Sequence, residues 1–275
     1  METATAIDAQ AIVLTPDDYT ILTEEDFGSP GVQATEMIGS FVRLQASGPL
    51  LAVHDSTWQP RLGVGHHPHR YNERLFYILE GEVDHDDSLN RITGHMGTGD
   101  LGRLTEGRGG MWHSEWNNTD GGARAFILVY PTDPMPARAS FAALRDGDAP
   151  RYDEGHGVKT KELVGPRSPL EIHGDIRLFA DSEMAPGAAL DLELQGGEGL
   201  LLTPLEGDAV VEGTPLPARH ALVIAPGDQS RAFQAIARSD SRVLRVVHGP
   251  GEGLVLGEPM MTRTQQMRAM TGRTS

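Results

Sequence analysis

Short apolar runs separated by turn residues dominate the pattern of hydrophobic and polar positions along the chain. The clearest runs, none long enough for an amphipathic helix, are 75–79, 125–130, 200–202, 221–224 and 243–247. Gly-containing turn signals recur between them, at 80–81, 99–100, 206–207 and 227–228. This alternation predicts an all-β protein of closely spaced antiparallel strands in a sandwich or barrel.

The two halves of the chain resemble each other, which predicts a duplicated barrel. The segment "LFYILEGEV" (75–83) is similar to "LLTPLEGDA" (201–209), which starts 126 residues later (201 − 75). Each is followed by a Gly-Asp turn, and these two turns lie 128 residues apart (227 − 99). A proline-rich stretch, 131–150, separates the halves. We therefore expect a first barrel over 1–140, a linker over 141–165, a second barrel over 166–256 and a tail over 257–275, where Thr262 or Thr264 can cap a short helix.

Composition narrows the classes of function. The formal net charge of −16 would repel a phosphate backbone and argues against direct nucleic-acid binding. No apolar run approaches the roughly 18 residues that span a membrane, and the first residues lack the basic start of a signal peptide, so we expect a cytoplasmic protein without a membrane partner. The count of zero cysteines excludes disulfides, thiolate ligands and cysteine nucleophiles, so any metal must be held by nitrogen and oxygen.

A candidate for such a metal site lies in two histidine-containing stretches. Three of the 11 histidines fall in "HHPHRYNE" (66–73), and a fourth stands near a glutamate in "HSEWN" (113–117). Because alternate residues of a strand share a face, His67 and His69 project together, as do His113 and Glu115. Two such strands lying opposite each other in a small barrel would converge three imidazoles and one carboxylate. The opposite face of the second strand is then expected to carry packing residues: Trp112, Ser114 and Trp116.

The same alternation of strand faces applies to the other ionisable residues of this half. An H-x-H pair alone is weak evidence, because histidines are often ordinary surface or core groups, and the H-x-E strand is what makes the pattern a site. Glu73 keeps the parity of His69 if the strand is unbroken, so it is a candidate ligand or a carboxylate that orients an imidazole. Three histidines without a partner at ligand spacing are interpreted as surface or packing residues: His66, His85 and His95.

The second half does not repeat the ligand pattern. The offset of 126 aligns His67 and His69 with Glu193 and Gln195, and the offset of 128 aligns His113 and Glu115 with Ser241 and Val243. Because this set cannot replace the first, we expect one metal per chain and a degenerate second barrel.

Taken together, these motifs resemble the pirins, a family of the cupin superfamily of two-barrel proteins. The resemblance rests on "HPHR", Glu73, "LEGEVDHDDSLN", "GDL", "GRG" and "HSEWN", in that order, and on "EPMMTRTQQMR" in the tail. It implies two tandem cupin (jelly-roll) β-barrels with a short C-terminal helix. It also implies metal ligands at His67, His69, His113 and Glu115, with Glu73 at a non-ligand position.

Two stretches depart from the pirin pattern near the expected mouth of the metal barrel. Most pirins have Gly-Phe where this chain has Tyr71-Asn72, and Trp-Met before Thr-Ala-Gly-Arg-Gly where this chain reads "RLTEGRG" (103–109). The added Arg103 and Glu106 weaken any inference about substrate from the resemblance, although they leave the expected fold and metal unchanged.

Three histidines and a carboxylate leave two positions of an octahedron open, which suits a redox-capable or Lewis-acidic ion that also binds substrate or dioxygen. Fe(II) is the first expectation, and nickel, manganese, copper and zinc fit the same ligands. Resemblance to bacterial pirins implies a quercetin 2,3-dioxygenase, an oxidoreductase that opens the ring of an aromatic flavonol with O2 and releases carbon monoxide. Glu115 is then the expected general base and catalytic residue.

Two alternatives stay open. Resemblance to eukaryotic pirin implies a metal-containing regulatory protein that binds a transcription factor or a metabolic enzyme, and the acidic charge favours a protein partner over nucleic acid. The other alternative is a metalloenzyme that uses the same barrel for another small molecule.

Overall fold

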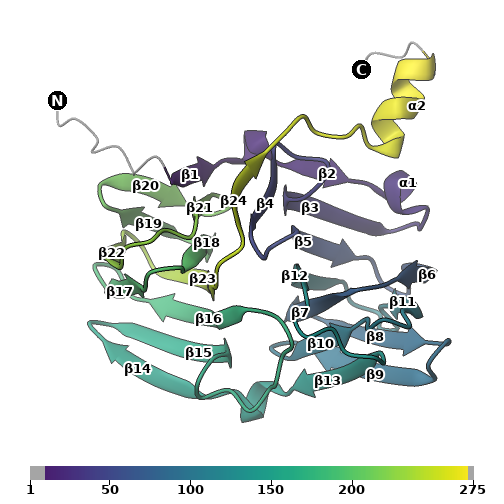
Figure 1. Cartoon of the computed structure of the whole chain (residues 1–275), viewed down its shortest axis with the longest axis horizontal. Coiled ribbons are helices and arrows are strands. Elements are labelled where there is room, and N and C mark those ends of the chain that lie inside the picture. Colours follow the sequence, from purple (N-terminus) through teal and green to yellow (C-terminus); the bar gives the residue numbers. More distant parts are fainter. Residues whose placement is uncertain (1–9, 272–275) are drawn as a thin grey trace. The chain divides into compact units, whose positions relative to one another are not determined.

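The structure, a computed structural model, describes residues 10–271 and consists mainly of β-strands, which confirms the predicted all-β class (Figure 1). The chain forms two compact units. Unit 1 is made from the chain up to Asp18, from 47–49 and from 149–255, and unit 2 is made from 19–46, 50–148 and the chain from 256. No helix in the described part of the chain is long and apolar enough to cross a membrane.

Unit 2 is built from two antiparallel sheets. In spatial order the larger sheet contains β13 (Ser140–Leu144), β10 (Leu101–Thr105), β7 (Asn72–Glu80), β12 (Ala123–Pro131), β5 (Ala52–Trp58), β3 (Val32–Ile38) and β2 (Thr20–Leu22). The smaller sheet contains β6 (Gly63–His69), β11 (Met111–Trp116), β8 (Glu82–Asp87) and β9 (Ile92–Gly97). Buried apolar side chains from both sheets, among them Phe76, Ile78, Val83 and Met96, form one core. The helical elements of this unit are α1 (Glu24–Phe27), η2 (Asp146–Asp148) and α2 (Arg263–Thr271).

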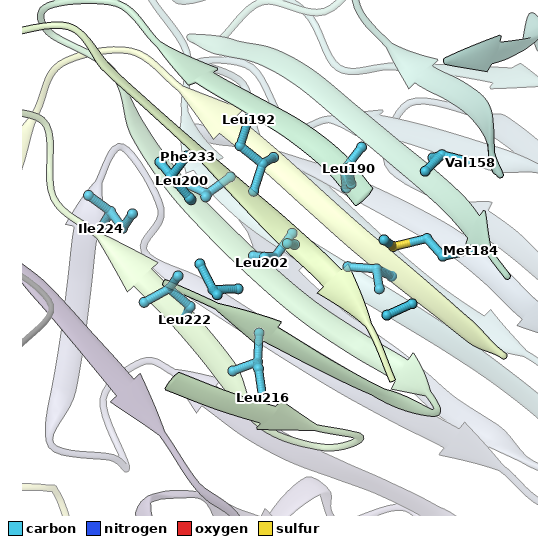
Figure 2. Close-up of a cluster of buried hydrophobic side chains, with 14 of the residues drawn as sticks. Val158, Met184, Leu190, Leu192, Leu200, Leu202, Leu216, Leu222, Ile224 and Phe233 are labelled. Atoms are coloured by element: carbon cyan, nitrogen blue, oxygen red, sulfur yellow. The ribbon is translucent and has the colours of Figure 1, made fainter. Parts of the chain in front are cut away.

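Unit 1 has the same two-sheet construction. Its larger sheet contains β1 (Ala11–Leu14), β21 (Ala221–Ile224), β18 (Gly199–Glu206), β23 (Ser241–His248), β16 (Ile176–Met184), β15 (Val158–Val164) and β14 (Arg151–Gly155). Its smaller sheet contains β17 (Ala189–Leu194), β22 (Arg231–Ala237), β19 (Asp208–Val211) and β20 (Thr214–Pro217). Figure 2 shows side chains of its buried core, including Leu190, Leu202 and Phe233. The short helix η1 (Pro16–Asp18) and the strands β4 (Leu44–Gly48) and β24 (Glu252–Leu256) complete the described elements.

The strand order of the two units is the same, as expected for a duplicated barrel. β7 lies between β10 and β12 in unit 2, and β18 lies between β21 and β23 in unit 1. The repeated Leu-Glu-Gly motif stands at the end of these two strands, at Leu79 and Leu205. The four-stranded sheets also share one strand order, because β6-β11-β8-β9 in unit 2 corresponds to β17-β22-β19-β20 in unit 1. The sequence offset of 126 therefore reflects one architecture built twice.

The segment expected to be a linker, 141–165, is largely strand. It holds most of β13 and all of β14 and β15, and the division between the units falls between Asp148 and Ala149. The proline content of the preceding stretch obscured these short strands. The N-terminal strand β1 also differs from the expected boundary, because it pairs with β21 and so belongs to unit 1.

The predicted C-terminal helix is present as α2. Thr262 caps it, since its hydroxyl accepts the backbone N–H of Gln265 at 3.2 Å and its own N–H donates to the Gln265 side chain at 2.9 Å. Thr264, the other expected cap, binds α1 instead: its N–H donates to Asp26 at 2.7 Å and its hydroxyl lies 3.0 Å from that of Thr23.

Candidate metal centre

The two histidine strands predicted from the sequence are neighbours in the smaller sheet of unit 2. β6 and β11 run antiparallel, with His67 opposite His113 and His69 opposite Met111. Between His113 and Glu115 the register shifts, so that Glu115 lies opposite Val64 and β6 holds one extra residue. The pairing brings side chains 44 residues apart (113 − 69) onto one face.

Three imidazole rings converge on this face. The ring centroids of His67 and His69 are 4.8 Å apart, those of His67 and His113 4.6 Å, and those of His69 and His113 4.9 Å. One nitrogen of each ring lies within 4.8 Å of one nitrogen of the other two. This spacing suits three donors around a single ion.

A buried carboxylate completes the cluster. Glu115 is 4% exposed, with Oε1 2.8 Å from His113 Nδ1 and Oε2 4.0 Å from His67 Nε2. Burial alone would raise its pKa, but the neighbouring His113 and His67 outweigh that effect and lower the pKa to about 2. Glu115 is therefore an anion at neutral pH, as a metal-binding carboxylate must be.

In two of the imidazoles, a hydrogen bond at one ring nitrogen leaves the other nitrogen with the lone pair that a metal requires. His67 Nδ1 lies 2.8 Å from the carbonyl oxygen of Gly65, so Nδ1 carries the proton and Nε2 keeps its lone pair. His113 Nδ1 donates to Glu115 in the same way, and its Nε2 is buried without a hydrogen-bond partner in the described part of the chain. An orphaned, buried acceptor facing other nitrogen and oxygen donors fits a transition-metal site.

His69 is held differently. Arg74 Nη2 lies 2.8 Å from His69 Nδ1, and a guanidinium can only donate, so this nitrogen accepts. Burial and the charge of Arg74 lower the pKa of His69 to about 2. Arg74 is itself fixed by Glu106, at 2.8 Å from its Nε, and Glu106 is fully buried. Of the two residues that depart from the pirin pattern, Glu106 thus contacts Arg74 beside the cluster, whereas Arg103 contacts Ser140 at 3.1 Å and Glu73 at 3.7 Å.

His85 belongs to the site, contrary to the sequence interpretation. It lies opposite Glu115 on β8, is 2% exposed, and places Nδ1 3.4 Å from His113 Nδ1. Its ring stacks on Phe141 with centroids 5.6 Å apart, and burial lowers its pKa to about 4. His85, His113 and Glu115 form a second close group of possible donors. The sequence did not indicate this role, because His85 has no second histidine two residues away on its own strand. Only the pairing of β8 with β11 brings it to Glu115.

The other two histidines lie on the surface, as expected. His66 Nε2 lies 2.9 Å from Asp86, and His95 Nδ1 lies 2.7 Å from Asp84. The expected packing role of Trp112 is wrong, since this side chain is 45% exposed.

Glu73 does not continue the face of His69. β6 ends at His69 and β7 starts at Asn72, with Tyr71 between them at a φ of 83°. The buried Glu73 carboxylate accepts hydrogen bonds from Thr105 at 2.5 Å and Tyr130 at 3.0 Å, and this pairing raises the pKa of Tyr130 beyond the rise that burial causes. Glu73 therefore belongs to a polar network of the larger sheet and lies outside both close donor groups.

In unit 1 the positions of the cluster are apolar. In unit 2, His113 pairs with His67 and Glu115 pairs with His85. At the equivalent positions of unit 1, Phe233 pairs with Leu192 and Ala235 pairs with Val211. The counterparts of the five site residues are therefore Leu192, Leu194, Val211, Phe233 and Ala235, and all five belong to the buried core of unit 1, where Figure 2 labels Leu192 and Phe233.

The sequence alignment of the halves was thus wrong in register, although its conclusion of a lost ligand set holds. The extra residue in β6 lowers the offset of 126 to 125 for His67 and His69, so their counterparts are Leu192 and Leu194 instead of Glu193 and Gln195. The offset of 128 fails because Ser241 and Val243 lie in β23, whose counterpart is β12 and not β11.

The cluster forms part of the wall of a cavity of about 740 Å³ within unit 2. His67, His69, Arg74 and Glu115 line one part of it, and apolar side chains of the larger sheet, including Phe76, Ile127 and Val129, line another. A cavity of this volume, lined by both apolar and polar side chains, suits a small organic molecule.

Comparisons with known proteins show similarity to one family. The family model described as Pirin matches residues 22–128. Pirin-1 of Arabidopsis thaliana is 29% identical over 226 residues, which cover 78% of this chain and 74% of that protein. Quercetin 2,3-dioxygenase of Escherichia coli (strain K12) is 27% identical over 202 residues, which cover 71% of this chain and 80% of that protein.

Solved structures share the fold. The structure of the bacterial pirin YhhW from Escherichia coli, in complex with nickel(II), matches with a TM-score of 0.71 at 17% identity. The match covers 87% of this chain and 99% of the YhhW chain. Quercetin 2,3-dioxygenase from Acinetobacter baumannii has a TM-score of 0.72 at 22% identity, with 94% of each chain covered.

Proposed function

The chain belongs to the pirin family, and from this premise we propose that it is a metal-dependent dioxygenase that cleaves a flavonol such as quercetin with O2. The observation that carries the proposal is the convergence of three imidazoles and one ionised carboxylate on the wall of a cavity large enough for an aromatic substrate. The relatives named quercetin 2,3-dioxygenase support the substrate class.

The residues that would hold the metal are His67, His69, His113 and Glu115. Neutral imidazoles and a carboxylate suit Fe(II), our first choice, and also nickel, manganese, copper and zinc. When bound, such an ion would polarise a substrate oxygen and supply the redox or Lewis-acid chemistry of the reaction. The apolar counterparts in unit 1 support one ion per chain.

Glu115 is the proposed proton acceptor at the cluster. Its low pKa keeps it ionised, and it lines the cavity, where it would receive the substrate's hydroxyl proton. The apolar side chains of the larger sheet would hold the aromatic rings of the substrate against this carboxylate.

Turnover of quercetin under air tests the proposal. Protein loaded in turn with iron, nickel and copper is mixed with quercetin, and its absorbance and the dissolved oxygen are followed together. We expect equal molar consumption of quercetin and O2 with at least one metal. Failure of all three forms to consume quercetin would reject the flavonol assignment.

A second candidate, a metal-containing protein that binds a protein partner, is favoured by the C-terminal segment. Four methionines there are between 46% and 82% exposed: Met260, Met261, Met267 and Met270. Flexible methionine side chains are common on surfaces that bind other proteins. A stoichiometric partner that co-purifies with a protein lacking turnover would support this function instead.

A further inference from the structure

A second histidine–carboxylate pair lines the cavity, away from the predicted ligand strands. His54 on β5 and Glu36 on β3 stand opposite each other in the larger sheet of unit 2, and both belong to the cavity wall. His54 Nε2 lies 2.9 Å from Glu36 Oε2, and the side chains are 18% and 4% exposed. Neither residue forms part of the motifs read from the sequence.

Glu36 closes a backbone turn, and this structural role is repeated in unit 1. Glu36 Oε1 accepts the N–H of Phe41 at 2.7 Å, and 126 residues later (162 − 36) Glu162 Oε1 accepts the N–H of Arg167 at 2.6 Å. Each glutamate is followed three positions later by a glycine with a positive φ, 153° at Gly39 and 151° at Gly165, where a Cβ would overlap the carboxyl group. A buried glutamate that closes this turn is therefore part of the fold of both units.

The histidine is not part of that repeated structure. β3 and β5 pair Glu36 with His54, whereas the same pairing of β15 and β16 places Ala180 opposite Glu162. In unit 1 the second carboxylate oxygen is bound by Tyr152 at 3.2 Å and by the Arg167 side chain at 3.3 Å. Unit 1 therefore closes the same turn with an alanine at this position, so the turn itself does not require His54.

The geometry gives His54 one nitrogen for chemistry. A carboxylate without a proton can only accept, so His54 Nε2 carries a proton and donates it to Glu36, and Nδ1 keeps its lone pair. Within the described residues no hydrogen bond to Nδ1 is formed. A histidine held by a carboxylate at one nitrogen and open at the other has the arrangement of a general base.

We propose that His54 is a second proton acceptor of the cavity and that the enzyme takes substrates with a second hydroxyl group, separate from the one at the histidine cluster. The inference rests on the proposed dioxygenase function and names the substrate class. The O–H bond of that second hydroxyl breaks, the proton moves to Nδ1, and the electron pair stays on the oxygen. Glu36 stabilises the imidazolium, and the proton returns to the same oxygen before the product leaves.

Two flavonols test the assignment: quercetin, which carries several hydroxyl groups, and 3-hydroxyflavone, which carries only the one expected at the cluster. We measure kcat/KM under air and binding without oxygen for the metal-loaded wild type and for His54→Ala. Ala180 shows that an alanine fits opposite the glutamate in the repeated strand pairing, and tryptophan fluorescence checks that unit 2 stays folded when Glu36 Oε2 loses its partner. We expect quercetin to lose at least about tenfold in kcat/KM, as for lost general-base assistance, while 3-hydroxyflavone changes little.

Glu36→Gln and Glu162→Gln form a matched pair of controls. Both remove a buried carboxylate that closes the repeated turn, so both should lower stability, but only Glu36→Gln should reduce the preference for quercetin. Equal preference in wild type and His54→Ala, with turnover intact, would overturn the role of His54 and leave the dioxygenase function standing. If the wild type neither binds nor consumes either flavonol, the proposed function fails and this substrate class fails with it.

Discussion

Replacing His85 by leucine should remove part of the acid sensitivity of the metal-free protein. The folded-state pKa of His85 is lowered from 6.5 to about 4, because its ring is buried against Phe141 and Glu115 does not offset that burial. As pH falls below 6.5, the unfolded chain takes up a proton at this residue that the folded chain does not take up until about pH 4. The stability is therefore complete above pH 6.5 and is lost between pH 6.5 and pH 4.

The magnitude follows from this interval. Each pH unit over which only the unfolded chain is protonated costs about 1.4 kcal/mol, so His85 should cost about 2 kcal/mol between pH 7 and pH 5. Glu115 is ionised in both states over this range and adds little. His67 and His69, whose pKa values are also lowered, stay in both proteins, so the difference between wild type and His85→Leu isolates His85.

Tryptophan fluorescence gives an assay that reports on unit 2 alone, because all three tryptophans, Trp58, Trp112 and Trp116, lie there. Urea unfolding with a chelator at pH 7 and pH 5 gives the free energy of unfolding for each protein. Any packing cost of the leucine is the same at both pH values and cancels. Val83→Ala, an apolar change on the same strand, should lower stability equally at both. Identical pH dependence in wild type and His85→Leu would show that the burial of His85 does not cause the acid sensitivity.

Three further outcomes are expected. Glu115→Gln should keep much of the metal and lower quercetin turnover by about a hundredfold or more, because an amide cannot accept the proton; undiminished turnover would exclude Glu115 as the base. His69→Ala should abolish tight metal binding whereas His66→Ala should not, and equal loss in chelator competition would show a strand register shifted by one. The double variant Arg74→Met, Glu106→Gln should bind metal at least about tenfold more tightly than Glu106→Gln alone, because the positive charge of Arg74 beside His69 opposes a divalent ion. Equal affinity of the two variants would show that Arg74 does not compete with the metal for His69.

The sequence predicted the features that depend on alternation along one strand. Period-two spacing placed His67 with His69 and His113 with Glu115, and the turn signals predicted the strands and the duplication. These features are local, since a strand fixes which side chains share a face whatever its neighbours are.

Features that depend on strand pairing could not be predicted. His85 reaches Glu115 only through the register of β8 with β11, and His54 reaches Glu36 only through that of β5 with β3. The extra residue in β6 has no sequence signature, yet it shifts His67 and His69 by one position when the halves are aligned. Glu73 was a candidate only if the strand continued past His69, and the strand ends within "RYN", where no glycine or proline signals a break.

Elemental analysis after metal loading tests whether one cluster in unit 2 holds a single transition-metal ion. Wild-type protein is loaded with iron or nickel, freed of excess ion, and measured beside His113→Ala and Phe233→Ala, which alter equivalent positions of the two units. We expect about one ion per chain in the wild type and in Phe233→Ala, and none retained in His113→Ala. Two ions bound with similar affinity, or an ion retained when His113 is removed, would contradict it.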